Sequence, residues 1–307
     1  MTSHPSRRST AASSQAGWPK IYAGVALTTA ATLLLELALT RIFSVILFYH
    51  FAFMAISVAL FGLGVGALFS YRLGERSRNV WNWLGLACTV NLGVTALLLV
   101  AVLNQQVTTK VTLGNGLKLA LVYLESAFPF FFAGIVISTA ISETIARVNR
   151  VYFFDLAGAA AGCLLLVPLL DWSGGPNTVL SAAALYGVAG TVWYAAAGLR
   201  RRSFLAASLA LVTAGFVVVN AKTRWLDLRL AKGRKIEAEL FVKWNSFSRV
   251  AVKAGEGDSN PLIVIDADAA TGIPSFSPEE LDSQSRAALL RAGAGLPNRI
   301  RPGAKTL

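Results

Sequence analysis

This chain of 307 residues has very little of the chemistry that binds metals or forms disulfides. It contains two cysteines, Cys88 and Cys163, and two histidines, His4 and His50. Both cysteines lie within apolar runs, where a thiol packs as a small apolar side chain, so the sequence predicts neither a disulfide framework nor a metal site. No grouping of nucleophile, base and acid residues is evident, and we therefore assign no catalytic residue.

Charge is also scarce. Only 14% of the residues are charged and 55% are hydrophobic, and the mean hydropathy is +0.58. This composition excludes an ordinary soluble domain and predicts a polytopic membrane protein whose first partner is the lipid bilayer. The net charge of +12 comes mainly from short basic clusters between apolar runs, where they act as topology signals. Because these clusters are short and scattered, no nucleic-acid partner is expected.

The apolar runs predict the architecture. Residues 1–20 lack apolar periodicity and are expected to form a disordered tail, not a signal peptide. Between residues 21 and 220, most apolar runs reach the roughly 20 residues that a crossing helix needs. The sequence therefore predicts a mainly α membrane bundle of about seven helices. The runs are Ile21–Leu47, Phe51–Tyr71, Trp83–Leu103, Leu117–Ile141, Val151–Leu170, Thr178–Leu199 and Phe204–Asn220.

Basic residues between the runs predict the orientation. Clusters rich in arginine alternate along the chain with loops poor in arginine, which indicates a multi-pass protein of the inner membrane with a cytoplasmic N-terminus. Seven crossings would leave everything after Asn220 outside, yet six basic residues crowd into positions 222–235. Either the seventh run is a tilted or non-spanning helix, or the tail is external, so the side of the tail stays open.

Apart from Lys118 at the start of its run, four charged residues lie inside the apolar runs: Glu36, Arg41, Glu125 and Asp155. Charges are expensive in lipid, so each should face a protein partner or a wet cavity. Glu36 and Arg41 are five residues apart, roughly 140° around a helix, and are not expected to pair directly. Glu125 or Asp155 is the expected partner of Arg41. Such a network is either structural or a polar relay for transport.

Small residues and a proline predict how the helices pack. Gly62, Gly64 and Gly66 give one helix a smooth face, and Gly158 and Gly162 form a small-xxx-small pattern that allows close backbone approach. Pro129 should kink its helix.

After residue 220 the composition changes to that of a small α+β tail. Residues 221–235 place Trp225 and several leucines among basic residues, which is typical of an amphipathic connector on a membrane surface. Alternation predicts strands at Ile236–Lys243, Ser246–Lys253 and Leu262–Asp266, with a glycine-containing turn between the last two. A capping box with Pro278 at the first position predicts a helix start there.

Two stretches of this tail resemble the N-terminal β-region of spermidine synthases. Lys243–Val252 (KWNSFSRVAV) is similar to the aromatic-Gln-x-Ile-x-Val pattern of that family, and Ile263–Thr271 (IVIDADAAT) is similar to its Leu-x-Leu-Asp-Gly-x-x-Gln pattern. The membrane part also looks like the helical block fused ahead of such domains in bacterial membrane proteins. Residues 236–307 would then begin a soluble domain that is truncated before its Rossmann part.

The resemblance implies substrate-side positions and a cofactor. Phe247 matches the aromatic position, Asp266 matches the aspartate of the second pattern, and Ser248 stands where the family has glutamine. Ala267 replaces the family glycine and Ala270 its second glutamine, so a broader S-adenosylmethionine-dependent transferase is implied in place of strict polyamine aminopropyl transfer. The cofactor, S-adenosylmethionine or its decarboxylated form, belongs to a longer parent chain.

No glycine-rich turn of the nucleotide-binding kind follows a suitable strand in these residues, so we expect no cofactor in this chain and no activity from it alone. The remainder of the transferase domain is the expected partner, and the oligomeric state is not predicted. Two other classes remain open: a transporter or channel-like module that uses the buried charges as a relay, and a membrane anchor that recruits partners through its tail.

Overall fold

The computed structural model describes residues 17–47, 51–73, 79–107, 112–236, 238–255, 260–273 and 282–291. Within these ranges, seven helices are long and apolar enough to cross a membrane, which confirms the predicted fold class of a multi-pass helical bundle. They are α2 (Trp18–Ile46), α3 (Ala52–Leu73), α4 (Val80–Asn104), α5 (Leu113–Glu143), α6 (Val148–Ser173), α7 (Gly175–Ala196) and α8 (Arg200–Thr223), with a short 3-10 turn, η2 (Ile145–Arg147), before α6.

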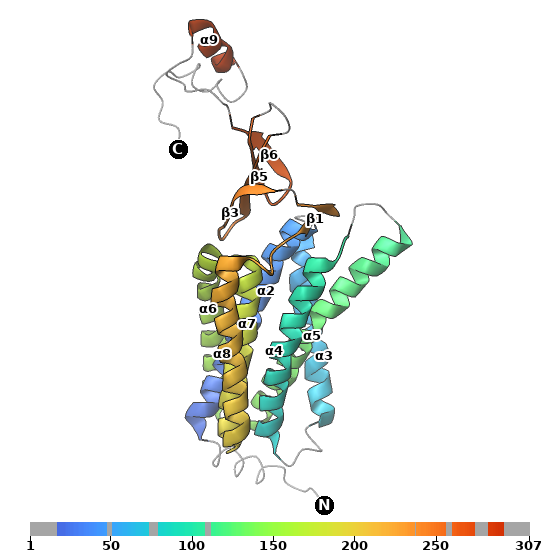
Figure 1. Cartoon of the computed structure of the whole chain (residues 1–307). Helices are drawn as coiled ribbons and strands as arrows, with labels where there is room; N and C mark the ends of the chain where they lie inside the picture. The colour runs from blue at the N-terminus through green and yellow to red at the C-terminus, as the bar shows by residue number, and fades with distance from the viewer. Residues whose placement is uncertain are drawn as a thin grey trace, which may run out of the picture.

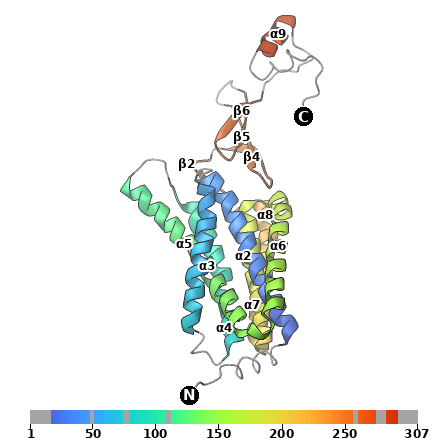
Figure 2. The ribbon, with the colours of Figure 1, turned by 180° about the vertical axis from the view of Figure 1, so that it is seen from behind.

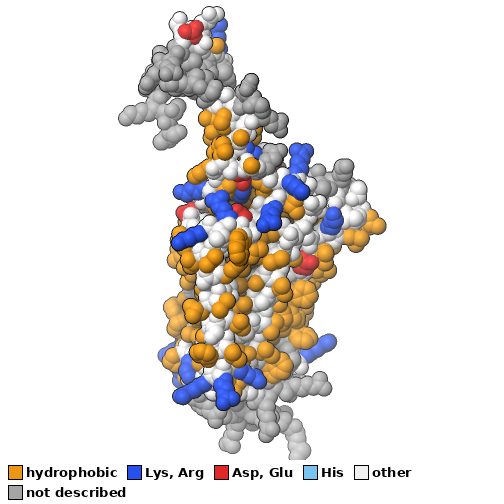
Figure 3. Space-filling view, viewed as in Figure 1, with side chains coloured by type: hydrophobic (Ala, Val, Ile, Leu, Met, Phe, Trp, Pro, Cys, Tyr) orange, Lys and Arg blue, Asp and Glu red, His pale blue; other side chains and the backbone are white. Residues whose placement is uncertain are grey.

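The length of the seventh helix bears on the topology that the sequence left open. α8 has 24 residues and runs beside α7 along the length of the bundle (Figure 1). It is therefore long enough to cross, and the start of α2 and the β-sheet lie at opposite ends of the molecule. Figure 3 shows hydrophobic side chains over the middle of the bundle and basic ones gathered at both ends, as a membrane-spanning block requires.

α2 occupies the centre of the bundle. It packs against α6 and α7 and also contacts α3 and α5, and most of its residues between Thr28 and Leu47 are buried (Figure 2). α6 approaches closely because Gly158 lies against the backbone of Ala26 and Gly162 against that of Ala30. A side chain at either glycine would collide with a carbonyl group, so the small-xxx-small pattern has the packing role that was predicted.

The second close helix pair is α3 with α5. Gly62 and Gly66 of α3 and Gly134 of α5 each lie directly against the backbone of the other helix, whereas Gly64 faces open space. Pro129 lies inside α5, and the N-terminal part of this helix leans away from the bundle (Figure 1). The side-chain amide of Asn91 on α4 donates to the carbonyl oxygen of Pro129 at 2.9 Å, which stabilises the region of the proline.

The tail forms two antiparallel sheets. β1 (Leu230–Ala231) pairs with β2 (Arg234–Lys235), and a four-stranded sheet runs in the order β3 (Glu239–Trp244), β4 (Arg249–Lys253), β5 (Leu262–Ile265) and β6 (Ala269–Gly272). The three predicted strands are thus present as an antiparallel sheet. β6 was not predicted, because all four of its residues are exposed and backbone pairing with β5 alone defines it. The connector after α8 is extended and ends in the β1–β2 hairpin.

The last described helix is α9 (Ser283–Arg291), which begins after Asp282. The Asp282 carboxylate accepts a hydrogen bond from the backbone N–H of Ser285, as an N-cap residue does. That bond, together with one from the Ser285 hydroxyl, lowers the pKa of Asp282. Two predicted features of the tail lie outside the described residues: the capping box at Pro278 and most of the glycine-containing turn before β5. The disordered tail predicted at the N-terminus also lies outside them, except for residues 17–20, which belong to α2 and its start.

The Gly158 contact generates a test. Gly158→Leu should lower the folded yield and the melting temperature in detergent, because overpacking against the backbone of Ala26 costs roughly 1–3 kcal/mol or more. The matched control is Gly64→Leu, which places the same side chain in open space on α3. Equal melting temperatures for the two variants would show that the α2–α6 approach does not depend on Gly158.

Candidate functional site

The four charged candidates of the membrane part do not share a network. The Arg41 guanidinium donates from Nη1 to the carbonyl oxygen of Phe247 at 2.9 Å. The carboxylate of Asp155 accepts from the Thr29 hydroxyl at 2.5 Å, and that of Glu125 accepts from the Gln105 amide at 2.9 Å. Among the described residues, the half-buried Glu36 side chain has no hydrogen bond or ion pair. The prediction that Glu125 or Asp155 pairs with Arg41 was therefore wrong.

The depth of each charge explains these separate partners. On three helices that run in the same direction, charged residues are about 20 or 21 positions apart: Lys20 and Arg41 on α2, Arg150 and Asp171 on α6, and Arg202 and Lys222 on α8. At about 1.5 Å per residue each interval spans about 30 Å, which is the thickness of the hydrocarbon core. Arg41 therefore lies at the boundary of the core and reaches the tail, whereas Glu36 and Asp155 lie within it.

The contact between Arg41 and Phe247 belongs to a larger junction between the bundle and the sheet. At the end of α2, the backbone N–H of Lys232 donates to the carbonyl oxygen of Ile46. At the corner between α6 and α7, the indole ring of Trp244 packs directly on Gly174 and Gly175. A Cβ atom on either glycine would meet the ring at 2.9 Å, so only glycine lets the sheet approach this closely.

Asn220 joins three segments at the same end of the bundle. It is buried in the last turn of α8, and its amide donates to the Asn177 side chain at 2.8 Å and to the Leu226 carbonyl oxygen at 3.0 Å. The side-chain oxygen Oδ1 of Asn220 accepts a hydrogen bond from the Leu226 N–H at 2.8 Å. One side chain thereby bonds α7 and positions the connector that leads into the sheet. Sequence reasoning missed it, although a polar residue at the end of an apolar run was a usable signal.

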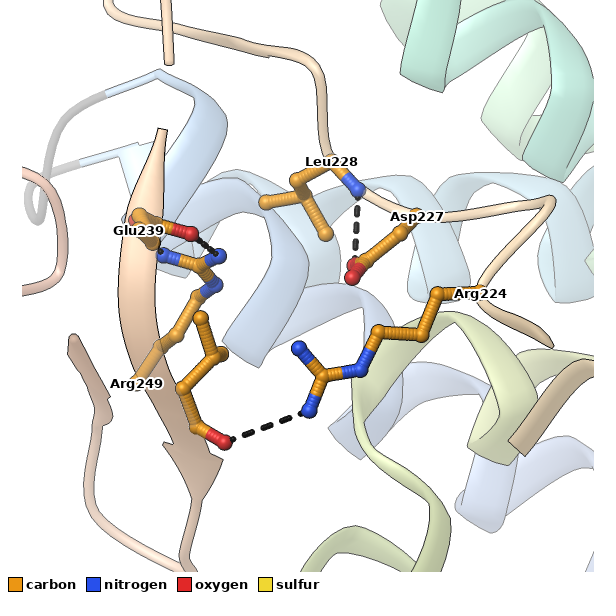
Figure 4. Close-up of polar contacts among 6 residues, drawn as sticks. Arg224, Asp227, Leu228, Glu239 and Arg249 are labelled. Atoms are coloured by element: carbon orange, nitrogen blue, oxygen red, sulfur yellow. Dashed lines mark hydrogen bonds and ion pairs between the residues drawn. The ribbon is translucent and has the colours of Figure 1, made fainter. Parts of the chain in front are cut away.

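Four charged residues form a compact cluster where the connector meets the sheet (Figure 4). Arg249 of β4 and Glu239 of β3 make a two-pronged ion pair with N–O distances of 2.8 and 2.6 Å, and their side chains are 1% and 11% exposed. Arg224 donates to the Val242 carbonyl oxygen at 3.5 Å, a weak bond. The buried ion pair links β3 to β4. Removing either partner would leave the other charge buried and unpaired, which is strongly destabilising.

Asp227, which lies on the connector, is the fourth charged residue of this cluster (Figure 4). Burial raises the pKa of its carboxyl group above the ordinary range, while the hydrogen bond from the Leu228 N–H and the nearby charges of Arg249 and Arg224 act in the opposite direction. Because the pKa is raised by folding, ionisation of Asp227 as the pH rises reduces the stability of the junction.

A small cavity opens beside the cluster. Its volume is about 100 Å³, and residues of α6, α7, α8, the connector and β3 line it, including Asp171, Asn177, Arg224, Lys243 and Trp244. Charges of both signs and the side chains of Asn177 and Asn220 thus line one partly open space at this end of the bundle. Within the described part of the chain, no three His, Cys, Asp or Glu side chains gather as a metal site would need.

The three residues taken from the family resemblance lie near one another in the sheet. Phe247 and Ser248 form the β3–β4 turn, where both backbone N–H groups donate to the Asn245 side chain. Asp266, in the turn after β5, accepts from the N–H of Arg249, which directly follows Ser248. The Phe247 ring points outward and is 81% exposed. None of the three residues lines the cavity.

The turn after β5 has an unusual backbone. Asp266 and Ala267 both have positive φ, at 49° and 55°, and the N–H of Asp268 bonds the carbonyl oxygen of Ile265. Positive φ at both central positions is typical of a type I′ turn, which favours Asp-Gly because glycine takes the second position without steric cost. Here that turn lies in the three-residue loop 266–268, between Ile265 and its strand partner Ala269. Ala267 therefore occupies a position whose geometry suits the glycine that the spermidine synthase pattern has there.

Comparison of this chain with protein-family models, with curated proteins and with solved structures finds no match. The resemblance to spermidine synthases consequently rests on the quoted residues alone.

The Arg249–Glu239 pair generates a test. Arg249→Met should destabilise the sheet by roughly 3–5 kcal/mol, because the buried Glu239 carboxylate loses its partner. Adding Glu239→Leu should recover most of that loss. The measurement is hydrogen exchange of the β4 amides in the full chain, with Arg234→Met, an exposed strand position, as the control. An Arg249→Met variant that exchanges like this control contradicts the assigned role.

The β5–β6 turn generates a second test. Ala267→Gly should stabilise the hairpin by about 1 kcal/mol, since alanine is strained at positive φ and glycine is not. Exchange of the β5 amides should slow about fivefold. Ala269→Gly, in the exposed strand β6, should have the opposite sign because glycine weakens a strand. Identical effects of the two changes would exclude backbone strain as the cause.

Proposed function

We propose that this chain is the membrane and β-region of a spermidine-synthase-like, S-adenosylmethionine-dependent transferase, and that it is inactive alone. The observation that carries the proposal is the docking of the sheet on the end of the bundle. The β3–β4 turn, which contains Phe247 and Ser248, is held there by Arg41 and Trp244, and Asp266 is linked to this turn through the N–H of Arg249. A bundle attached in this way would hold the soluble domain at a defined place above the membrane.

Two further features support the family assignment. Strands occur where the family patterns imply them, in an antiparallel sheet. The positive φ angles at Asp266 and Ala267 belong to a turn that prefers Asp-Gly, which is the dipeptide of the family pattern at this place. In this proposal the cofactor domain comes after the sheet in a longer parent chain and completes the site.

Orientation limits the proposal. With seven crossings, the start of α2 and the sheet lie on opposite sides of the membrane. We assign the N-terminal end to the cytoplasmic side of an inner membrane, because the intervening arginine clusters gather at that end. The reverse orientation would place the sheet in the cytoplasm. Labelling a cysteine introduced at Ala269 with a membrane-impermeant reagent in sealed vesicles distinguishes the two orientations.

The transporter alternative has less support. A relay needs charged groups that exchange protons or ions with one another, and the four candidate side chains have separate partners or none among the described residues. A plain membrane anchor would use the same junction between bundle and sheet. It differs from the transferase proposal only in having no cofactor-binding domain after the sheet.

Calorimetric titration tests the proposal. The purified 307-residue protein should give no saturable heat with S-adenosylmethionine or its decarboxylated form at millimolar ligand. A parent chain extended by about 150 residues, one domain length, should bind. Micromolar binding by the short chain would overturn the assigned place of the cofactor, and an extended chain that binds neither form would leave the anchor as the better explanation.

A further inference from the structure

The tip of the β3–β4 hairpin combines an exposed aromatic ring with a backbone that polar contacts hold in place. The Phe247 ring is 81% exposed, although its residue is held from two directions: the carbonyl oxygen accepts from Arg41, and the N–H donates to the Asn245 side chain. A large apolar side chain fixed in an exposed position is typical of a contact surface, because a turn without such a role normally has polar residues at its tip.

The depth of Arg41 locates this tip relative to the bilayer. Arg41 lies about 21 residues beyond Lys20 on α2, and this interval matches the thickness of the hydrocarbon core. Arg41 also precedes the end of α2 at Ile46 by five residues, so the Phe247 carbonyl that it binds lies below the top of the helix. The hairpin tip therefore reaches down to the boundary between acyl chains and headgroups.

Other side chains at the same end have the composition of a membrane interface. Trp172, in the last turn of α6, and Trp225, just after α8, are both largely exposed. Lys222 lies in the last turn of α8, and Lys243 precedes the Trp244 that packs on the corner between α6 and α7. Aromatic rings interspersed with basic residues are typical of the headgroup layer, where amphipathic rings and lipid phosphates meet.

We propose that Phe247 inserts into the lipid interface and anchors the β3–β4 hairpin to the membrane. The occupant of the exposed surface is phospholipid, because the ring lies at the same end of the bundle as the exposed Trp172 and Trp225 and its residue is held by Arg41 at the boundary of the hydrocarbon core. The sheet is then held to the bundle through Arg41 and the other contacts of the junction, and to lipid through the Phe247 ring. This role does not depend on any transferase activity.

Spin-label accessibility tests the depth of the tip. A nitroxide is attached at Phe247→Cys in the full chain, with Cys88→Ala and Cys163→Ser removing the native thiols, in vesicles of phosphatidylethanolamine and phosphatidylglycerol. Matched labels at Phe241→Cys, an exposed aromatic on β3, and at Leu211→Cys, an exposed residue midway along α8, give the aqueous and lipid references. Relaxation by oxygen reports lipid, and relaxation by a water-soluble nickel complex reports solvent.

The label at 247 should have an oxygen-to-nickel accessibility ratio several times that at 241 and below that at 211. A ratio at 247 equal to that at 241 would overturn the proposal and would favour a role for Phe247 toward a soluble domain or a substrate. A second copy of the chain on this surface would instead exclude both reagents at 247, and that result also contradicts lipid insertion.

A second measurement is hydrogen exchange of the hairpin amides, with the wild-type protein, which has the native Phe247 ring, as the reference. In the same vesicles, Phe247→Asp should speed hydrogen exchange of the hairpin amides severalfold, because a carboxylate does not insert into the interface. Phe241→Asp should leave the exchange of the tip unchanged. A Phe247→Asp variant whose hairpin amides exchange like those of the wild type in these vesicles would contradict lipid insertion.

Discussion

The thickness of the hydrocarbon core is the constraint on which the arrangement of this protein depends. A charge within the core needs a partner, so the charged residues that end the apolar stretches of α2, α6 and α8 lie about 30 Å apart. That spacing places Arg41 at the boundary, where its guanidinium reaches a carbonyl group of the sheet. It leaves Glu36 and Asp155 as the charges that lie within the core on α2 and α6.

Close helix packing results from the same apolar environment. Lipid chains are as apolar as leucine, so helices associate through tight contact of small residues and through hydrogen bonds between helices. Gly158 and Gly162 serve α2 and α6 in this way, and Gly62, Gly66 and Gly134 serve α3 and α5. The Tyr186 hydroxyl on α7 donates to the hydroxyl of Thr32 on α2 at 3.0 Å and adds a polar contact in the core.

At the membrane boundary, hydrogen bonds and an ion pair replace the apolar contacts that hold the helices together. Asn220, the Arg249–Glu239 pair and the Arg41 contact satisfy groups that would otherwise be desolvated where the chain leaves the bundle. These bonds join segments of α2, α7, α8, the connector and the sheet, so the first part of the soluble tail is held against the bundle. The small cavity at this junction is lined by residues of α6, α7, α8, the connector and β3.

The amino-acid sequence by itself determined the number and order of the crossing helices, the close-packing face formed by Gly158 and Gly162, and the strands β3, β4 and β5. Each of these arises from a local pattern of apolar, small or alternating residues that burial imposes on a single element. Only the tertiary structure decided that Arg41 binds Phe247, that Asn220 positions the connector and that Ala269–Gly272 pairs as β6. Arg41 and Phe247 are 206 positions apart, and no local pattern contains information about which distant group lies at the same depth.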